Sequence, residues 1–307
     1  MDADNAAIGT FPDMNIFRLT SALILAFALS LTPSIPSWAS DAALIKNGSV
    51  KINLAGRQRM LTQRMAKAVC FAAIGVMPEA HMDMMREAYD LFDKTLTGLR
   101  EGDEEQGLLA ENNPIILEEL SFVEALWAQY GAAVRTAKSG PSGAVIALTG
   151  VAQLNLPTLR QMNKTVGEFE AFYGRAGVKH PSLALAINVS GRQRMLSQKA
   201  AKEFCLVAAS KNVSENRKAL AGTVSLFDTS LEAMLFGNEE LGIAEAPTEE
   251  IREQLRRVKE IWEPIKAIFE TSIQGGYVSP EDMQAVAEGN NVLLVEANKA
   301  VQMYVGL

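Results

Sequence analysis

Apolar residues recur along most of the chain at a spacing near 3.6, and polar or Gly/Pro-rich segments separate the runs. This pattern predicts an all-α fold without strands. The expected helices lie near residues 42–75, 79–101, 114–138, 148–174, 182–210, 213–237, 247–273 and 279–305. Pro114 and Pro280 each fit the first turn of a helix, where a missing N–H costs nothing. We expect loops at EGDEEQG (101–107) and SGPSG (139–143).

The second half of the chain repeats the first at an offset of 135 residues. GRQRMLTQRMAK at 56–67 returns as GRQRMLSQKAAK at 191–202, and other identical pairs keep the same offset without a gap. Four helices with short connections are typical of an antiparallel bundle. We therefore expect two tandem antiparallel up-down four-helix bundles related by a pseudo-twofold. The first covers residues 40–176 and the second covers residues 177–307.

The N-terminus has the pattern of an export signal. Arg18 precedes an apolar run that ends at Leu31, and Ser37-Trp38-Ala39 places small residues at −3 and −1. Residues 1–39 are therefore predicted to be a signal peptide cleaved after Ala39, with Met14 as an alternative start. An uncleaved membrane anchor is the alternative interpretation. Either one indicates a periplasmic location.

Composition narrows the function classes. The 307 residues are 48% hydrophobic and 21% charged, and the net charge of −7 argues against a nucleic-acid partner. There is no nucleophile elbow, P-loop, zinc motif or Glu-x-x-His pair. We therefore expect no enzyme activity, no cofactor and no metal site, and we expect His81 and His180 to be lone residues in loops. The helically spaced methionines are expected to fill the core, namely Met60, Met65, Met82, Met84 and Met85.

The first helix of each copy carries a stripe that the duplication left unchanged. At about 100° per residue, six residues lie within roughly 40° of one line. These are Ile52, Gly56, Arg59, Gln63, Ala66 and Cys70, and they are identical to Ile187, Gly191, Arg194, Gln198, Ala201 and Cys205. The predicted core face varies more, since Leu54 becomes Val189 and Met65 becomes Ala200. Packing alone therefore does not explain why the stripe is unchanged.

The composition of the stripe suggests an anion site. If the two first helices face each other, Arg59 and Arg194 converge, and unpaired buried cations are costly. A small oxyanion between them would remove that cost, because guanidinium binds planar oxyanions through two parallel bonds. We take Arg59 and Arg194 as the main ligands. The further candidate ligand-binding residues are Arg57, Arg192, Gly56, Gly191, Asn53, Asn188, Gln63 and Gln198.

Other interpretations of the same residues stay open. A solvated helix face is the alternative for Arg57 and Arg192, and it is the expectation for Arg64, Lys67, Lys199 and Lys202. The stripe could instead join two chains, with each arginine paired to a carboxylate. Cys70 and Cys205 either form a disulfide between the copies or are two separately buried thiols.

The repeated pattern I-N-x-[AS]-G-R-Q-R-M-L-[ST]-Q resembles the PilJ-like sensor domain at the N-terminus of type IV pilus methyl-accepting chemotaxis transducers. It also resembles the P-box of nitrate/nitrite sensor histidine kinases. The resemblance implies periplasmic four-helix bundles. In the nitrate sensors, two subunits hold one nitrate between their first helices through the P-box arginine, which matches Arg59 and Arg194 here. Those sensors lack the additional arginine that stands here as Arg57 and Arg192.

The expected function is therefore an exported sensor or binding protein for a small oxyanion, with nitrate or nitrite favoured by the resemblance. The sequence ends at Leu307, directly after the last predicted helix. The signal is expected to pass to a membrane partner such as a sensor kinase, a chemoreceptor or a transporter. The alternative is a periplasmic protein–protein interaction module that serves a chemoreceptor or pilus system without a small ligand.

Overall fold

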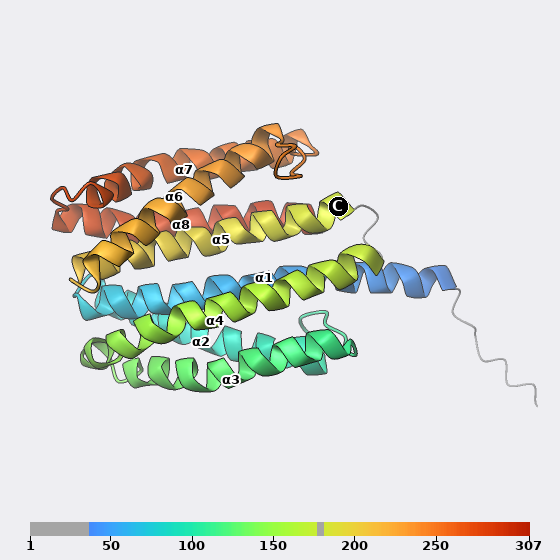
Figure 1. Cartoon of the computed structure of the whole chain (residues 1–307), viewed down its shortest axis with the longest axis horizontal. Coiled ribbons are helices and arrows are strands. Elements are labelled where there is room, and N and C mark those ends of the chain that lie inside the picture. The colour runs from blue at the N-terminus through green and yellow to red at the C-terminus, as the bar shows by residue number, and fades with distance from the viewer. Residues whose placement is uncertain (1–36, 177–180) are drawn as a thin grey trace, which may run out of the picture. The chain divides into compact units, whose positions relative to one another are not determined.

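The computed structural model describes residues 37–176 and 181–307, and this part of the chain forms eight α-helices (Figure 1). They are α1 (Ser37–Ala73), α2 (Pro78–Glu101), α3 (Pro114–Ala137), α4 (Pro141–Ala176), α5 (Pro181–Ala208), α6 (Val213–Phe236), α7 (Glu249–Ile273) and α8 (Pro280–Val305). The predicted all-α class is confirmed. Most of the predicted signal peptide, with Arg18 and Met14, and also His180 lie outside the described residues.

The two sets of four helices meet through their first helices. Helix α1 packs against α2 and α4, and α5 packs against α6 and α8. Helix α3 packs against α4 in the first set, and α7 packs against α8 in the second. Helices α1 and α5 also pack directly on each other, side by side (Figure 1). This contact places the two copies of the repeated stripe at one junction.

Six of the eight helix starts lie within two residues of the prediction, whereas α1 begins five residues early, at Ser37, and α4 also begins early. Helix α4 begins at Pro141, about two turns before the predicted residue 148. SGPSG is therefore not a loop throughout, because Pro141 is preset for a first helical turn and Gly140 makes the preceding bend at a φ of 103°. Elsewhere Asn113 caps α3, and Ser279 caps α8 in a capping box.

The core of each bundle contains one tryptophan from its third helix. The indole Nε1 of Trp127 donates to Asp93 at 2.8 Å, and that of Trp262 donates to Asp228 at 2.7 Å. Both indole rings are buried in the core of their own bundle. The five helically spaced methionines are also buried in the core, as predicted.

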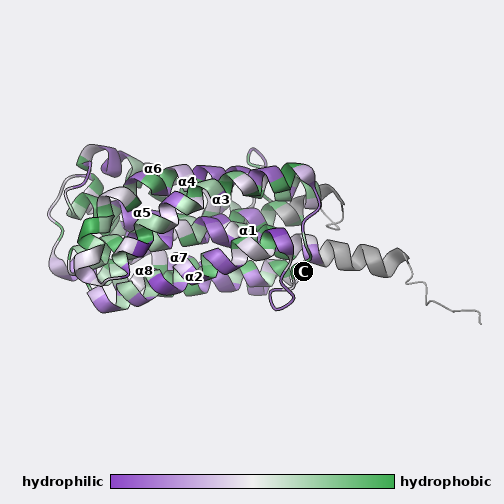
Figure 2. Ribbon diagram, turned by 90° about the horizontal axis from the view of Figure 1, so that it is seen from below, coloured by the Kyte–Doolittle hydropathy of each residue, from purple (hydrophilic) through white to green (hydrophobic). Residues whose placement is uncertain are grey.

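Two described stretches are long and apolar enough to cross a membrane by length and composition. They are Pro141–Gly174 and Val213–Phe236. About half of each apolar window is buried among the other helices, 44% in the first and 50% in the second. Hydrophobic and hydrophilic residues are interspersed along the labelled helices (Figure 2). Both stretches therefore also fit the core helices of a bundle.

The loop environment predicted for His81 is wrong. His81 lies in the first turn of α2, is 1% exposed and stacks on Phe71 with ring centroids 5.0 Å apart. Its Nδ1 lies 2.9 Å from the carbonyl oxygen of Val76 and 3.1 Å from that of Met77. The helix starts at Pro78, so its first turn already packs against α1 and buries the imidazole.

This burial predicts a specific loss of stability in acid. Burial, helped by the positive charges of Lys67 and Arg64, lowers the pKa of His81 from 6.5 to about 4. The unfolded chain therefore takes up this proton first as the pH falls. Stability present above pH 6.5 should be lost as the pH falls towards 4, by roughly 3 kcal/mol at most. Denaturant unfolding at a series of pH values measures this loss.

The control is His81→Asn, because asparagine stands at the equivalent position in the second copy, Asn216. This variant carries no group that titrates in the window, and its amide can still donate to the backbone carbonyls. It should lose clearly less stability than the wild type between pH 6.5 and 4.5. Equal losses in the two proteins would show that His81 is not the cause.

Candidate functional site

The two arginines of the repeated stripe meet at the junction between α1 and α5. A Cβ added to Gly56 would lie 3.3 Å from Nη2 of Arg59 and 3.9 Å from Nη2 of Arg194. A Cβ added to Gly191 would lie 3.3 Å from Nη2 of Arg194 and 3.7 Å from Nη2 of Arg59. The two guanidinium groups therefore converge on one region. The glycines leave the space that the groups occupy.

Each arginine reaches across to the helix of the other copy. Nη2 of Arg194 donates to the side chain of Asn53 at 2.9 Å and to its backbone carbonyl at 3.3 Å. Nη2 of Arg59 donates to the backbone carbonyl of Asn188 at 3.3 Å. Arg194 gains one more bond, from Nη1 to Asn298 of α8 at 2.8 Å. These reciprocal contacts have the form of a pseudo-twofold interface.

The positive charge at this junction is poorly compensated. Arg59 is 3% exposed and Arg194 is 1% exposed. Among the described residues, neither has a carboxylate within 4.0 Å, and neither Nε has a hydrogen-bond partner. Burial lowers the pKa of each to about 9, with a further contribution from Arg192 at Arg59 and from Arg59 and Arg57 at Arg194. With a pKa of about 9, both remain mainly charged at neutral pH.

One acidic side chain, not expected from the sequence, lies near the pair. Glu170 of α4 accepts a hydrogen bond from the side chain of Asn188 and interacts electrostatically with Arg59 and Arg192. Burial raises the pKa of Glu170, while that bond and the two arginines act in the opposite direction. The equivalent position in the second copy is Val305. The carboxylate is therefore present on only one side of the junction. Comparing the two copies of the repeat does not single out Glu170, because its equivalent is apolar.

Among the other predicted ligands, Gly56 and Gly191 lie against the pair and Arg192 acts electrostatically on Arg59. Arg57, Gln63 and Gln198 bond to groups away from the pair. Nη2 of Arg57 donates to Thr95 at 2.8 Å and to Gln106 at 2.7 Å, both within its own bundle. Gln63 accepts from Lys202, and Gln198 donates to Asn290, so both amides belong to a separate polar layer. The structure thus brings together the two main arginines and the two asparagines of the motif. It does not bring in these glutamines.

The predicted solvated face is wrong for Lys67 and Lys202. Both are buried, and both donate across the junction to the opposite bundle. Nζ of Lys67 lies 2.9 Å from Asn290, and Nζ of Lys202 lies 3.1 Å from both Asn155 and Gln63. Polar residues of α4 and α8 receive the two ammonium groups there, in place of water.

Arg64 and Lys199 are also less exposed than predicted. Arg64 is half-buried, and burial lowers its pKa. The side chain of Lys199 is 19% exposed and forms an ion pair with Glu203 at 2.6 Å. A fully solvated face is therefore not present at this part of α1 and α5.

The two cysteines form a disulfide between α1 and α5. Their Cα atoms are 6.1 Å apart, and both side chains are buried. Since Arg59 meets Arg194 and Cys70 meets Cys205, the two helices run parallel and in register. The stripe is covered within the chain, so it is not a free surface for joining a second chain. This removes the basis for the dimer interpretation.

Comparisons with known proteins agree with the motif. Residues 43–149 and 180–277 match the family model described as type IV pili methyl-accepting chemotaxis transducer N-term, PilJ. The chain is also similar to the methyl-accepting chemotaxis protein McpN of Pseudomonas aeruginosa, with 32% identity over 117 residues. That alignment covers 38% of this chain and 21% of McpN, so the chain spans only about a fifth of this relative. Because the family model matches both copies and more than half of the residues, this chain belongs to the PilJ family of type IV pilus methyl-accepting chemotaxis transducer N-terminal domains.

Proposed function

We propose that this chain is a sensor module that binds one small oxyanion, with nitrate or nitrite favoured, between Arg59 and Arg194. The observation that carries the proposal is the convergence of two buried guanidinium groups without a carboxylate partner in the described structure. Two like charges in a buried junction repel each other, and each is costly to desolvate. A bound anion offsets both effects and contributes charge-assisted hydrogen bonds.

The geometry suits a small planar oxyanion. Each guanidinium is a planar fork, and the free Nε of Arg59 and of Arg194 adds a donor on each side. The ligand would bridge α1 and α5, so its binding energy would favour one relative position of the two helices. Belonging to a chemotaxis transducer family supports a signalling role for such a shift.

Location and partner are part of the same proposal. The export signal pattern and the family favour a periplasmic protein. The receiver of the signal would be a membrane-bound partner of the chemoreceptor or sensor-kinase type. We propose neither a catalytic role nor a cofactor for the chain.

A second candidate is an interaction module without a small ligand. The comparisons favour it in one respect, because they point to chemotaxis transducers and do not name an anion. In this case the buried arginines would serve only to hold α1 and α5 together through Asn53 and Asn188. The two candidates differ in whether an added anion stabilises the protein.

Calorimetric titration and thermal unfolding with nitrate, nitrite, sulfate and phosphate test the proposal. Chloride keeps the ionic strength constant. A specific anion should raise the melting temperature in proportion to the logarithm of its concentration above Kd, with one site per chain. A flat response to all four anions, together with no heat of binding, would leave the interaction module as the better description.

Removing the charge of Glu170 is expected to strengthen nitrate binding, whereas removing a ligand arginine should weaken it. Glu170→Gln removes the acid that acts on Arg59 but keeps a side chain that can accept from Asn188. Nitrate should then bind roughly three- to tenfold more tightly, because one competing negative charge is gone. Calorimetry at pH 7 measures the change. The matched control is Glu168→Gln on the same helix, which should leave the affinity unchanged, and equal affinities in both variants would exclude this role of Glu170.

A further inference from the structure

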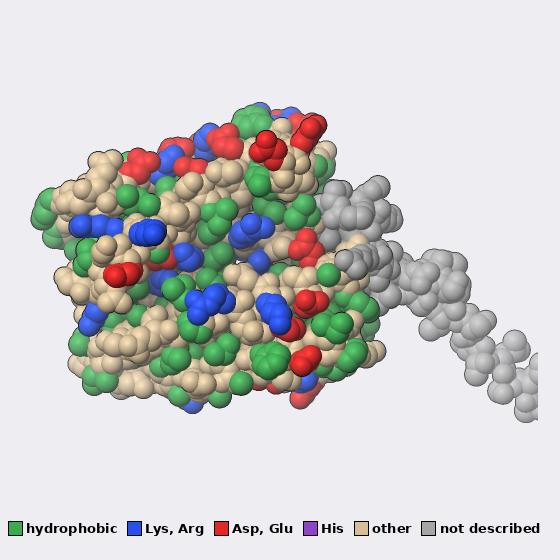
Figure 3. Space-filling view, in the orientation of Figure 1, with side chains coloured by type: hydrophobic (Ala, Val, Ile, Leu, Met, Phe, Trp, Pro, Cys, Tyr) green, Lys and Arg blue, Asp and Glu red, His purple; other side chains and the backbone are tan. Residues whose placement is uncertain are grey.

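A cavity of about 400 Å³ opens between α4 of the first bundle and the corner of α5 and α6 in the second. This volume is within the range of small-molecule sites. On the face shown in Figure 3, Lys and Arg side chains gather along the seam that these helices border. Lys202 and Glu203 line the cavity from α5. The cavity is distinct from the arginine junction, which it does not include.

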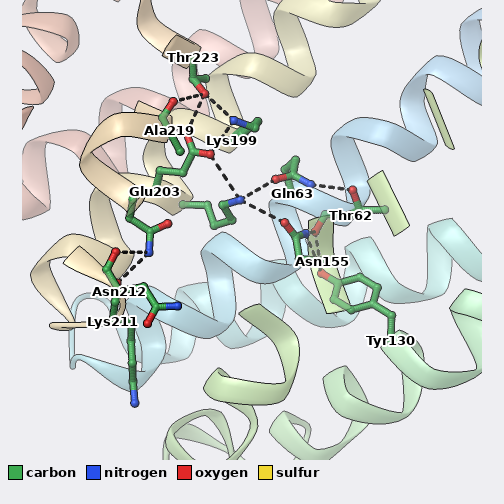
Figure 4. Close-up of polar contacts among 12 residues, drawn as sticks. Thr62, Gln63, Tyr130, Asn155, Lys199, Glu203, Lys211, Asn212, Ala219 and Thr223 are labelled. Carbon is green, nitrogen blue, oxygen red and sulfur yellow. Dashed lines mark hydrogen bonds and ion pairs between the residues drawn. The ribbon is translucent and has the colours of Figure 1, made fainter. Parts of the chain in front are cut away.

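The charged residues on the cavity lining are Lys202, Glu203, Lys211 and Glu215, and Lys199 pairs with Glu203 from outside the lining, so three ammonium groups face two carboxylates. Glu203 is already engaged by Lys199 at 2.6 Å and by the hydroxyl of Thr223 at 2.7 Å (Figure 4). Lys202 lies 3.8 Å from the same carboxylate. Two ammonium groups therefore share one buried carboxylate. The cavity end is suited to one further negative charge.

The ammonium of Lys202 lies closer to neutral acceptors than to the Glu203 carboxylate. Its nearest acceptors are the side-chain oxygens of Gln63 on α1 and Asn155 on α4, both at 3.1 Å (Figure 4 labels both). Burial lowers the pKa of Lys202 to about 8, so it is still mainly protonated at pH 7. Amide oxygens accept from its donors but carry no charge, and Glu203 is shared with Lys199. A ligand carboxylate would add a second negative charge beside Lys202.

Four apolar side chains line the cavity together with polar and charged ones. Ala152 and Leu156 come from α4, Leu206 comes from α5 and Ala219 comes from α6. A bare inorganic anion would leave these surfaces without contact. An apolar ligand body would bury them, in addition to any contact with Lys202.

The equivalent corner of the first copy is filled by larger side chains. Leu206, Asn216 and Ala219 correspond at the 135-residue offset to Phe71, His81 and Met84. All three of these larger side chains are buried, and Phe71 stacks on His81.

The buried lysine is kept in both copies, as Lys67 and Lys202, while only the second copy carries the smaller side chains. The two corners also differ in charge, because Glu203, Lys211 and Glu215 correspond to Ala68, Val76 and Ala80 in the first copy. The smaller side chains and these charged groups are thus particular to the second copy. If the helices were poorly packed throughout, a cavity would be expected at this corner in both copies.

We propose that this cavity binds a small organic monocarboxylate with an apolar body. The carboxylate would pair with Lys202, and the body would lie among Ala152, Leu156, Leu206 and Ala219. The proposal does not rest on anion binding at the arginine junction. The ligand would contact α4, α5 and α6 together, so it would act on the same interface between the two bundles.

Benzoate is the probe, and benzamide is its neutral counterpart of the same shape. Calorimetry and thermal unfolding with benzoate should show saturable binding to the wild type, and benzamide should bind at least tenfold more weakly. Amide chemical shifts of Ala152 and Ala219 should move with the same saturation curve. The absence of saturable benzoate binding would overturn the proposal, and so would equal binding of benzamide.

Ala219→Met is the decisive variant, because it restores the residue that fills the first copy at Met84. It should weaken benzoate binding at least tenfold while unfolding as cooperatively as the wild type. Unchanged benzoate affinity in Ala219→Met would place the binding elsewhere and contradict the proposal. Lys202→Met should also lose benzoate binding, and circular dichroism checks that it folds.

Nitrate titration of Ala219→Met separates this site from the arginine junction. Its nitrate response should equal that of the wild type, whatever that response is. The two proposals can therefore fail independently. Competition between nitrate and benzoate for one site in the wild type would contradict the existence of two sites.

Discussion

Arg59→Met is expected to bind nitrate at least 100-fold more weakly and yet to raise the melting temperature of the ligand-free protein. The loss corresponds to about 2.7 kcal/mol, the size of a strong charge-assisted interaction in a buried site. The gain has a separate cause. Methionine removes a buried charge whose pKa is lowered to about 9, and the one hydrogen bond lost is the 3.3 Å contact with Asn188. Calorimetry measures the first effect and thermal unfolding without ligand measures the second.

The matched control is Arg57→Met, two residues earlier on the same helix. Arg57 bonds to Thr95 and Gln106 within its own bundle, so its removal should lower stability and change nitrate affinity only a few-fold. The two variants thus have opposite expected effects. If Arg57→Met lost nitrate binding while Arg59→Met kept it, the assignment of the main ligand would be wrong.

A gain in stability on losing Arg59 would indicate why the arginine is present at this junction. A residue kept for packing should not destabilise the protein that contains it. Side chains that lower the stability of the folded protein are typical of functional sites, where they are already positioned for a ligand. The unchanged stripe in both copies has the same meaning, since Leu54 and Met65 of the core face have changed between the copies while Arg59 has not.

The helices and the meeting of the two arginines could be predicted because both depend on local periodicity and on the repeat. Residue spacing alone places Arg59 and Cys70 on one side of the first helix. An identical stripe in the second copy then makes the two helices natural partners. The start of α4 escaped prediction because Pro141 and its neighbouring glycines are as typical of a loop as of a helix start.

The buried lysines could not be predicted from their own helix. Lys67 is buried because Asn290 of α8 accepts from it, and these residues are 223 positions apart in the sequence. A helical wheel of residues 52–70 does not contain that acceptor. Glu170 was missed for a related reason, since its relation to Arg59 depends on how the end of α4 packs. By contrast, comparing Leu206 with Phe71 across the repeat could have indicated the cavity.

Removing the disulfide is expected to have the largest effect on stability. The bridge joins residues 135 positions apart, and the loop-closure entropy of a loop this long corresponds to about 5 kcal/mol in the chain-entropy model. The Cys70→Ala/Cys205→Ala double variant should therefore unfold at much lower denaturant concentration than the oxidised wild type. The single variant Cys70→Ala should be about as unstable as the double variant, because either change removes the link. Equal stability of the oxidised wild type and the double variant would contradict a bridge that holds the two copies together.

The same double variant should also weaken nitrate binding, and this links the bridge to the site. The disulfide lies 11 residues beyond Arg59 on α1, or about 16 Å along the helix. With the bridge in place, α1 and α5 cannot separate to relieve the repulsion between Arg59 and Arg194. Without it they can, and nitrate must then first bring the two helices together. We expect a loss of affinity of roughly tenfold, measured by calorimetry at a temperature where the double variant is folded, whereas unchanged affinity would show that packing of α1 on α5 alone holds the arginines in place.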